Sequence, residues 1–349
     1  MRFEWSVAGG IEALSVLAGV RFDRLFTELD AIVESYTKGL PLARDMFPDV
    51  AFGPPRWAAI SYGHVNCLGS ALVFPENSEV AHTPVYGSLE EGVQALEQHV
   101  DFAQAGMFPF YLDLWEQVKK AFPEHDVPFT GFGDEGPITT AWLLRGHSFF
   151  MDIYENPPLT KRYLELVTAS IIKYRKLLRS INGEPAFSET GTGLADDGAS
   201  MVPPALWPEF VMPFLEQYFT ALTSGSRSGH IEDLCVDHLP YLDALGLTHY
   251  DPSVSRKLTP SLIRRNCHVS FTWRLTSVEL GAATPTGVER WVVDAAAGGA
   301  PAVRTTAGRD NCTPQGAENM RVFIRTAERV RRVLEEGCPR ERLHVESGI

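Results

Sequence analysis

From about residue 126 onward, short apolar stretches alternate with amphipathic helical stretches at roughly 30-residue spacing. The apolar stretches run into polar ends such as "GFGDEG", "LADD", "THYD", "FTWR" and "TTAGRD". This alternation predicts βαβ units and a parallel sheet. Because there are many such units, we expect an α/β fold closed into a (β/α)8 TIM barrel. Barrel enzymes place their chemistry at the carboxyl ends of the strands, where the polar residues of this chain collect.

The first third of the chain follows a different rhythm. Helical periodicity is present in 22–40, 88–100 and 113–122. Ser88 precedes Glu91 by three residues, the pattern of a capping box at a helix start. We therefore predict a single domain, 1–349. Residues 1–125 form mostly a helical extension with the first barrel elements, and residues 126–349 form the barrel.

Composition restricts the class of protein. Hydrophobic residues make up 44% and charged residues 21% of 349 residues, which allows a sizeable core. The formal net charge of −13 argues against nucleic acid or an anionic membrane as the main partner. Five irregularly spaced cysteines do not suggest a disulfide scaffold. No signal peptide and no apolar run long enough to cross a membrane is recognised, so we expect a cytoplasmic protein.

One short stretch concentrates possible metal ligands. "SGHIEDLC" places an imidazole, two carboxylates and a thiol between His230 and Cys235. His230 and Glu232 are two residues apart, so in an extended segment both can point to one side. An ordinary alternative is that Glu232 and Asp233 favour the first turn of the following helix through its dipole. Phosphate-binding P-loop and serine-hydrolase G-x-S-x-G motifs are not found.

Four stretches, in this order, resemble the uroporphyrinogen decarboxylase superfamily: "GPITTAWLLRG", "LADDGASMVPPALWPEFVMPFLEQYF", "GHIEDLCVDHLPYLDALGL" and "AGRDNCTPQGAENMRVFIRTAERV". The resemblance covers about residues 125–330 and implies a barrel. It also implies one of two activities. The decarboxylases need no metal, but their arginine-bearing N-terminal motif is not recognised here. The other branch consists of cobalamin-dependent methyltransferases, whose zinc site combines a His-x-Cys pair with a distal Cys.

The resemblance to the second branch implies a zinc site made of His230, Glu232 and Cys312. His230 stands at the family's His position, Glu232 replaces the Cys two residues on, and Cys312 stands at the distal Cys position. Replacing a thiolate by a carboxylate keeps the charge count and makes the metal a stronger Lewis acid. Cys235 is a substitute ligand if Glu232 points away. Since the family's D-x-H-x-x-G corrinoid pattern is absent, the corrinoid is expected from a partner protein.

Further polar and aromatic residues follow the predicted strands. We assign catalytic roles to Asp197 and Glu232. Substrate-binding roles are assigned to Asp134, Asp196, Tyr250, Trp273, Arg274 and Arg304. Each also has an ordinary reading, for example a helix N-cap for the aspartates and a core aromatic for the tryptophan. His64 and Cys67 are interpreted as structural or pocket-lining residues.

The expected function is a zinc-dependent methyltransferase that moves a methyl group between a corrinoid (methylcobalamin) and a thiol or similar small-molecule acceptor. Two alternatives stay open. One is a metal-free decarboxylase that acts on a carboxylated substrate through Asp197 and an arginine. The other is a non-catalytic barrel that binds a corrinoid or tetrapyrrole.

Overall fold

A computed structural model describes residues 2–346. Its centre is a parallel sheet of six strands in the order β1-β8-β7-β6-β5-β4. The strands are β1 (Glu4–Gly9), β4 (Gly191–Ala195), β5 (Ser226–His230), β6 (His249–Asp251), β7 (Ser270–Arg274) and β8 (Ala302–Ala307). The parallel barrel predicted from the alternation is confirmed, although its first strand begins much earlier than the alternation itself.

Two irregular segments complete the ring between β1 and β4. Gly9, at the end of β1, forms a parallel bridge with Phe52, and Ile60 forms another with Phe132. The amide of Gly136 then donates to the carbonyl of Ala195 in β4. The chain around 51–60 and 129–136 thus takes the places of the second and third barrel strands with very few ladder hydrogen bonds.

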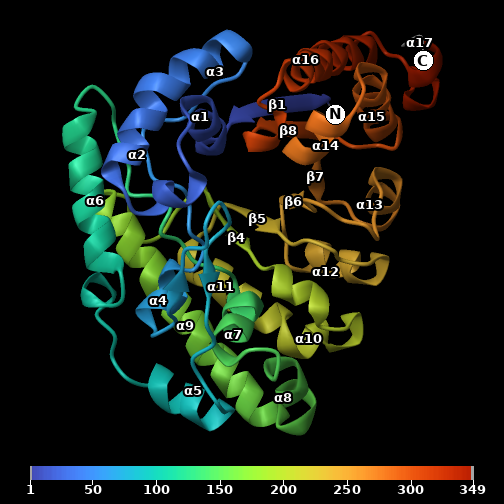
Figure 1. Cartoon of the computed structure of the whole chain (residues 1–349). Coiled ribbons are helices and arrows are strands. Elements are labelled where there is room, and N and C mark those ends of the chain that lie inside the picture. The colour runs from blue at the N-terminus through green and yellow to red at the C-terminus, as the bar shows by residue number, and fades with distance from the viewer. Residues whose placement is uncertain (1, 347–349) are drawn as a thin grey trace.

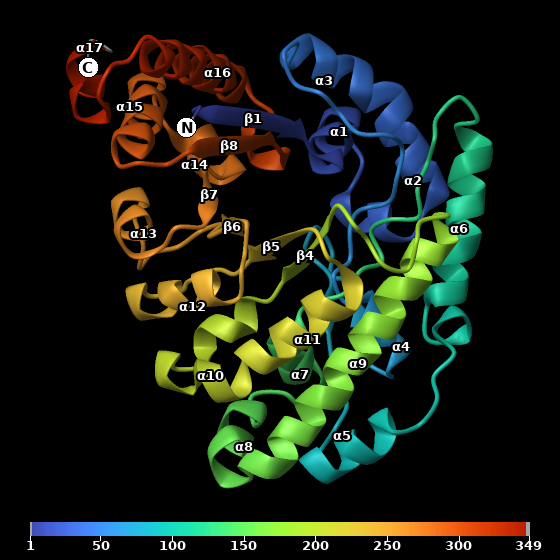
Figure 2. The same cartoon turned by 180° about the vertical axis from the view of Figure 1, so that it is seen from behind.

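Helices surround the strands (Figures 1 and 2). Those of the first half are α1 (Ile11–Ala18), α2 (Leu29–Glu34), a π-helical turn (Ser35–Gly39), α3 (Leu40–Met46), α4 (Gly63–Cys67), α5 (Leu89–Leu96), α6 (Phe108–Ala121), α7 (Pro137–Arg145), α8 (Phe149–Glu155) and α9 (Pro157–Ile181). Those of the second half are α10 (Trp207–Phe210), α11 (Met212–Leu222), α12 (Leu239–Ala244), α13 (Pro260–Asn266), α14 (Ser277–Ala282), α15 (Pro285–Ala297), α16 (Pro314–Glu335) and α17 (Leu343–Glu346). A short antiparallel pair joins β2 (Leu72–Val73) to β3 (Ala81–His82).

Local sequence signals set several helix starts. The Ser88 hydroxyl accepts a hydrogen bond from the Glu91 amide, and the Glu91 carboxylate accepts one from the Gly87 amide. This reciprocal arrangement satisfies amides that the helix leaves without a partner. The Asn156 side chain caps the long helix α9 by accepting the Leu159 amide, and Pro157 follows Asn156 at the first helical position.

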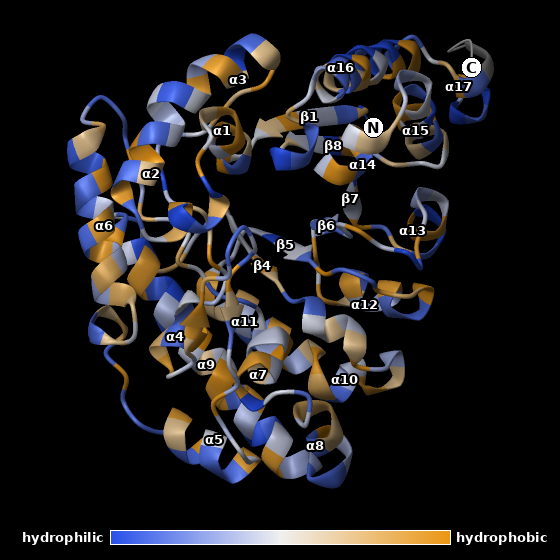
Figure 3. Ribbon diagram, viewed as in Figure 1, coloured by the Kyte–Doolittle hydropathy of each residue, from blue (hydrophilic) through white to orange (hydrophobic). Residues whose placement is uncertain are grey.

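Two apolar clusters hold the molecule together. The larger one lies between the sheet and helices such as α9, α11, α15 and α16. The second belongs mostly to the N-terminal part and is rich in aromatic rings, with Trp57 in contact with both Tyr111 and Phe129. Along the outer helices hydrophobic and hydrophilic residues alternate, as expected for helices with one buried face (Figure 3). No helix among the described residues is long and apolar enough to span a bilayer.

Candidate metal centre

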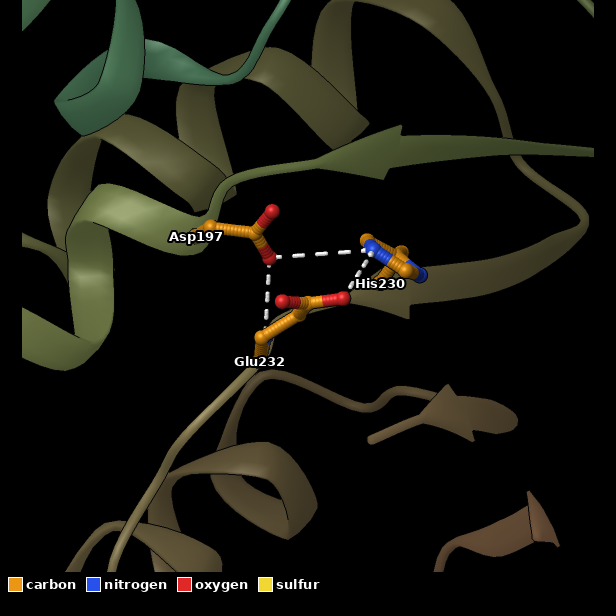
Figure 4. Close-up of side chains that lie close together, drawn as sticks. All are labelled: Asp197, His230 and Glu232. Atoms are coloured by element: carbon orange, nitrogen blue, oxygen red, sulfur yellow. Dashed lines mark hydrogen bonds and ion pairs between the residues drawn. The ribbon is translucent and has the colours of Figure 1, made fainter. Parts of the chain in front are cut away.

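Three side chains converge where β4 and β5 end (Figure 4). His230 is the last residue of β5 and lies beside Ala195, the last residue of β4. Neighbouring parallel strands end at the same edge of the sheet, so the residues that follow them meet. Asp197 is two residues beyond β4, and Glu232 is two residues beyond β5.

The three donor groups face one another at metal-binding separations. Nε2 of His230 lies 3.8 Å from Oδ1 of Asp197 and 3.7 Å from Oε1 of Glu232. Tetrahedral zinc with bonds of about 2.1 Å would hold its ligand atoms about 3.4 Å apart, so only small side-chain shifts are needed. Within the described residues, this is the only group of at least three potential ligands whose donor atoms all lie within 4.8 Å of one another.

Asp251, at the end of β6, fixes the orientation of the imidazole. Its Oδ2 is 2.9 Å from Nδ1 of His230. An ionised carboxylate only accepts hydrogen bonds, so Nδ1 carries the proton and Nε2 presents its lone pair to Asp197 and Glu232. Metal-binding histidines are commonly held this way by a carboxylate behind them.

Two guanidinium groups hold Asp251 in turn. Nη2 of Arg274 and Nη2 of Arg304 donate to Oδ2 of Asp251 at 2.9 and 2.7 Å. The Ser253 amide donates to Oδ1 at 2.9 Å. Burial would raise the pKa of Asp251, but the hydrogen bond from His230 and the charge of Arg274 lower it below its ordinary value. Asp251 therefore remains ionised behind the imidazole.

The electrostatics of the other two groups follow from their surroundings. Burial would lower the pKa of His230, but its hydrogen bond to Asp251 and the charge of Asp197 outweigh burial and raise it. Burial raises the pKa of Asp197, and the charges of Glu232 and Asp251 act in the same direction. Without a cation the cluster therefore favours protonation at both residues. A divalent ion would compensate the two carboxylates and relieve that tendency.

The donor set fits a divalent metal without sulfur. One imidazole and two carboxylates balance two positive charges and leave a fourth position free, as in catalytic zinc sites. Oδ1 of Asp197 accepts the Glu232 amide at 2.8 Å, which ties the two loops together around the cluster. This bond positions the Asp197 carboxylate before any ion binds.

The third donor group of the cluster belongs to Asp197, whereas the sequence predicted Cys312 as the third ligand. The Cys312 thiol donates to the carbonyl of Gly308 at 3.2 Å and approaches that of Ala13 at 3.8 Å, and it is not part of the described cluster. Burial raises its pKa to about 11, which disfavours the thiolate that a metal needs. Cys235 also lies outside the cluster, because its sulfur contacts Nδ1 of His238 at 3.2 Å.

Two of the residues predicted to bind the substrate, Arg274 and Arg304, are linked to the cluster through Asp251. Trp273 alternates with Arg274 along β7 and packs partly buried against the main core. Tyr250 is fully buried, and its hydroxyl donates to the Ile231 carbonyl at 3.0 Å. Both aromatic rings therefore support the strands that carry the site.

The two predicted aspartates at neighbouring strand ends are held inside the protein. Asp196 is fully buried and accepts hydrogen bonds from the Ile138 and Thr139 amides, at 3.3 and 2.7 Å, and from the Thr139 hydroxyl at 2.9 Å. It thus caps the start of α7. Asp134 is only 2% exposed and pairs with Arg175 at 2.7 Å.

His64 and Cys67 lie in α4, and the His64 amide donates to the carbonyl of Gly133, next to Asp134. His64 is fully buried with Nε2 2.9 Å from the Ser170 hydroxyl, and burial lowers its pKa to about 3. The Cys67 thiol donates to the Ala105 carbonyl at 3.5 Å. Both therefore have structural environments, in line with the structural interpretation of the sequence.

Sequence reasoning left two features unassigned. Asp251 had no role, although it follows a strand next to the one that ends at His230; that adjacency was the available signal. Glu135 was treated as a loop residue. Burial raises its pKa to about 8, and the charge of Asp197 adds to the effect. A protonatable carboxyl group therefore lies in the electrostatic range of the cluster.

Comparison with known proteins gives two results. The model of the family described as uroporphyrinogen decarboxylase (URO-D) matches residues 63–258, more than half of the chain. A solved structure of a methyltransferase from Methanosarcina mazei superposes with a TM-score of 0.67 at 16% sequence identity, over 94% of each chain. No curated protein matches the sequence significantly. At this identity the superposition supports the fold alone.

Proposed function

The chain belongs to the uroporphyrinogen decarboxylase family, and we propose that within it this protein works as a zinc-dependent methyltransferase. The reaction moves a methyl group from a corrinoid, supplied by a partner protein, to a thiol or similar small acceptor. The observation that carries the proposal is the convergence of Asp197, His230 and Glu232 at the carboxyl ends of β4 and β5. The solved barrel of similar fold that is named a methyltransferase adds support.

A bound zinc ion would supply Lewis acidity that favours the thiolate form of the acceptor. The chain's own residues prepare the site for it. Asp251 holds His230 in the tautomer that leaves Nε2 free, and Arg274 and Arg304 keep Asp251 in place. The Glu232 amide holds Oδ1 of Asp197 and leaves its other oxygen, Oδ2, to accept the proton of the acceptor thiol.

The transfer balances without an oxidant or reductant. The acceptor sulfur uses a lone pair to form the new sulfur–carbon bond. A corrinoid donor would keep both electrons of its bond to the methyl group, and the thiol proton would go to Asp197. The acceptor sulfur would have to reach the methyl carbon from the side opposite the donor, so the donor would have to dock over the open end of the barrel, where Asp197, His230 and Glu232 lie.

A metal-free decarboxylase is the second candidate, and the two arginines beside Asp251 favour it, because guanidinium groups bind carboxylates. Each of these arginines already donates through Nη2 to Asp251. The two functions separate cleanly in one experiment. Treatment with a chelator abolishes the methyl transfer and leaves a metal-free decarboxylation unchanged.

Metal content tests the proposal first. Protein purified without chelator is expected to contain about one zinc per chain, and His230→Ala to contain far less. The matched control is His268→Ala, since His268 also pairs with an aspartate, Asp243 at 3.2 Å, but is 94% exposed. Zinc well below one per chain in the unaltered protein, or equal loss in both variants, contradicts the proposal.

A further inference from the structure

A hollow of about 320 Å³ opens at the same end of the barrel as the candidate ligands Asp197, His230 and Glu232. The ends of β7 and β8 form one part of its wall, with Arg274, Thr306 and Arg309. The start of α1 and the loop before β3 form another part, with Glu12 and Glu79. None of these residues except Arg274 takes part in the cluster described above.

Arg274 links the hollow to the metal cluster. Its Nη2 donates to Asp251, which holds His230. Its Nε is buried and has no hydrogen-bond partner among the described residues. The Arg274 side chain lines the hollow and is 26% exposed, so part of its guanidinium group is open to a ligand. An anionic group in the hollow would pair with this guanidinium group.

The part of the wall formed by α1 and the loop before β3 carries two carboxylates without a salt-bridge partner in the described part of the chain. Neither Glu12 nor Glu79 has a cationic partner within 4.0 Å among the described residues, and neither carboxylate accepts a hydrogen bond in them. Burial raises the pKa of Glu79, and the charge of Glu12 raises it further, so the two carboxylates are close enough to repel. Arg309 lowers the pKa of Glu79 only in part; its Nη1 donates to the Asn77 carbonyl at 3.1 Å. A cationic group would compensate this pair.

The two walls are separated by a distance that a small molecule can span. Glu12 follows β1, Arg274 ends β7, and β8 lies between these strands. Two strand spacings are about 10 Å, and both Glu12 and Arg274 line the same hollow, so a small molecule can contact both. A ligand with opposite charges a few ångströms apart matches both walls at once. A ligand with a single charge would satisfy one wall and leave the other uncompensated.

We propose that this hollow binds a small zwitterion of the α-amino acid class, with its carboxylate at Arg274 and its ammonium group between Glu12 and Glu79. The proposal rests on the proposed function in one respect, that the molecule bound there is the sulfur-bearing methyl acceptor. Selectivity comes from the paired charges. A thiol that lacks either the ammonium or the carboxylate group is bound more weakly.

Calorimetry with a methylated product analogue tests the hollow without turnover and without metal. The probes are S-methyl-L-cysteine, 3-(methylthio)propionate, which lacks the ammonium group, and 2-(methylthio)ethylamine, which lacks the carboxylate. We expect S-methyl-L-cysteine to bind about tenfold or more tightly than either analogue. Equal dissociation constants for all three, or no binding by any of them, overturn the proposal.

A pair of variants on one loop identifies the ammonium subsite. Glu79→Gln should raise the dissociation constant of S-methyl-L-cysteine about fivefold or more and leave that of 3-(methylthio)propionate nearly unchanged. Glu76→Gln is the control, because Glu76 lies three residues away and pairs with Arg21 at 2.9 Å. Glu12→Gln should act like Glu79→Gln. Unchanged selectivity in both hollow variants overturns the assignment.

The results also separate this proposal from the function. Selective binding of the zwitterion by a protein that holds no zinc supports the hollow and contradicts the metal-dependent reaction. A full complement of zinc without selectivity for the zwitterion supports the reaction and overturns the assignment of the hollow.

Discussion

Oδ2 of Asp251 lies 2.9 Å from Nδ1 of His230, so the end of β6 sets the orientation of the imidazole at the end of β5. The same oxygen accepts from Arg274 and Arg304. A single carboxylate on β6 therefore contacts side chains of β5, β7 and β8 behind the candidate ligand. Asp251 contacts His230 directly but is not itself a candidate ligand. A substitution at Asp251 therefore tests the positioning of the imidazole without removing a ligand.

Asp251→Asn is expected to weaken zinc binding about 10- to 100-fold, because the amide no longer fixes His230 in the required tautomer. Competition with a zinc-binding dye measures the affinity. Asp243→Asn, which alters the half-buried aspartate paired with the exposed His268, should leave the affinity unchanged. An Asp251→Asn protein that is folded and binds zinc normally would show that the carboxylate does not position the imidazole.

Cys312→Ser is expected to retain the full zinc content. The Cys312 sulfur donates to the Gly308 carbonyl, and a serine hydroxyl can make the same hydrogen bond. Asp197→Asn should lower the zinc content, since it removes the charge of a ligand. Elemental analysis of the two purified variants decides between them. Loss of zinc in Cys312→Ser with retention in Asp197→Asn would restore the ligand set suggested by the sequence.

Glu135 should make the metal-free protein less stable as the pH rises. Burial raises its pKa to about 8 from an ordinary 4.5, so the folded chain holds a proton that the unfolded chain has released. The free energy of unfolding therefore falls between these two pKa values, by at most about 1.4 kcal/mol per pH unit.

Glu135→Gln removes this titration and should flatten the fall. Urea unfolding of chelator-treated protein at about pH 5 and about pH 8 measures it. The variant should gain in free energy of unfolding relative to the unaltered protein at the higher pH. Parallel pH dependence in the two proteins would show that Glu135 titrates near its ordinary pKa.

Asp196→Ala should destabilise the fold without direct loss of a metal ligand. The substitution leaves the Ile138 and Thr139 amides at the start of α7 without their acceptor in a fully buried place. We expect a loss of about 1–3 kcal/mol in the free energy of unfolding, measured by denaturant titration. Asp196→Asn keeps a side-chain acceptor and should lose less. Equal stability of Asp196→Ala and the unaltered protein would contradict the capping role.

Much of the architecture could be predicted from local patterns. The helix at 158–181 and the cap at Ser88 were visible, because amphipathic periodicity and capping depend on nearby residues. The places of the second and third strands were harder to recognise. Around Ile60 and Phe132 the chain makes isolated bridges and no regular ladder, so it lacks the alternation by which strands are identified.

The site was predictable to the extent that its residues share one strand end. His230 and Glu232 are two residues apart, and their joint orientation follows from extended backbone geometry. The third member depended on how separate loops fold. Asp197 reaches the cluster because its carboxylate accepts the Glu232 amide, whereas the short helical turn before Cys312 directs its thiol to Gly308. Neither contact produces a periodic sequence pattern from which it could have been predicted.

X-ray absorption and anomalous scattering at the zinc edge, recorded on a crystal of protein purified without chelator, test the central claim most directly. The account predicts one zinc ion about 2.0–2.2 Å from Nε2 of His230 and from one oxygen each of Asp197 and Glu232, with no protein sulfur bound. An absent ion, or an ion bound elsewhere or through Cys312, would contradict it.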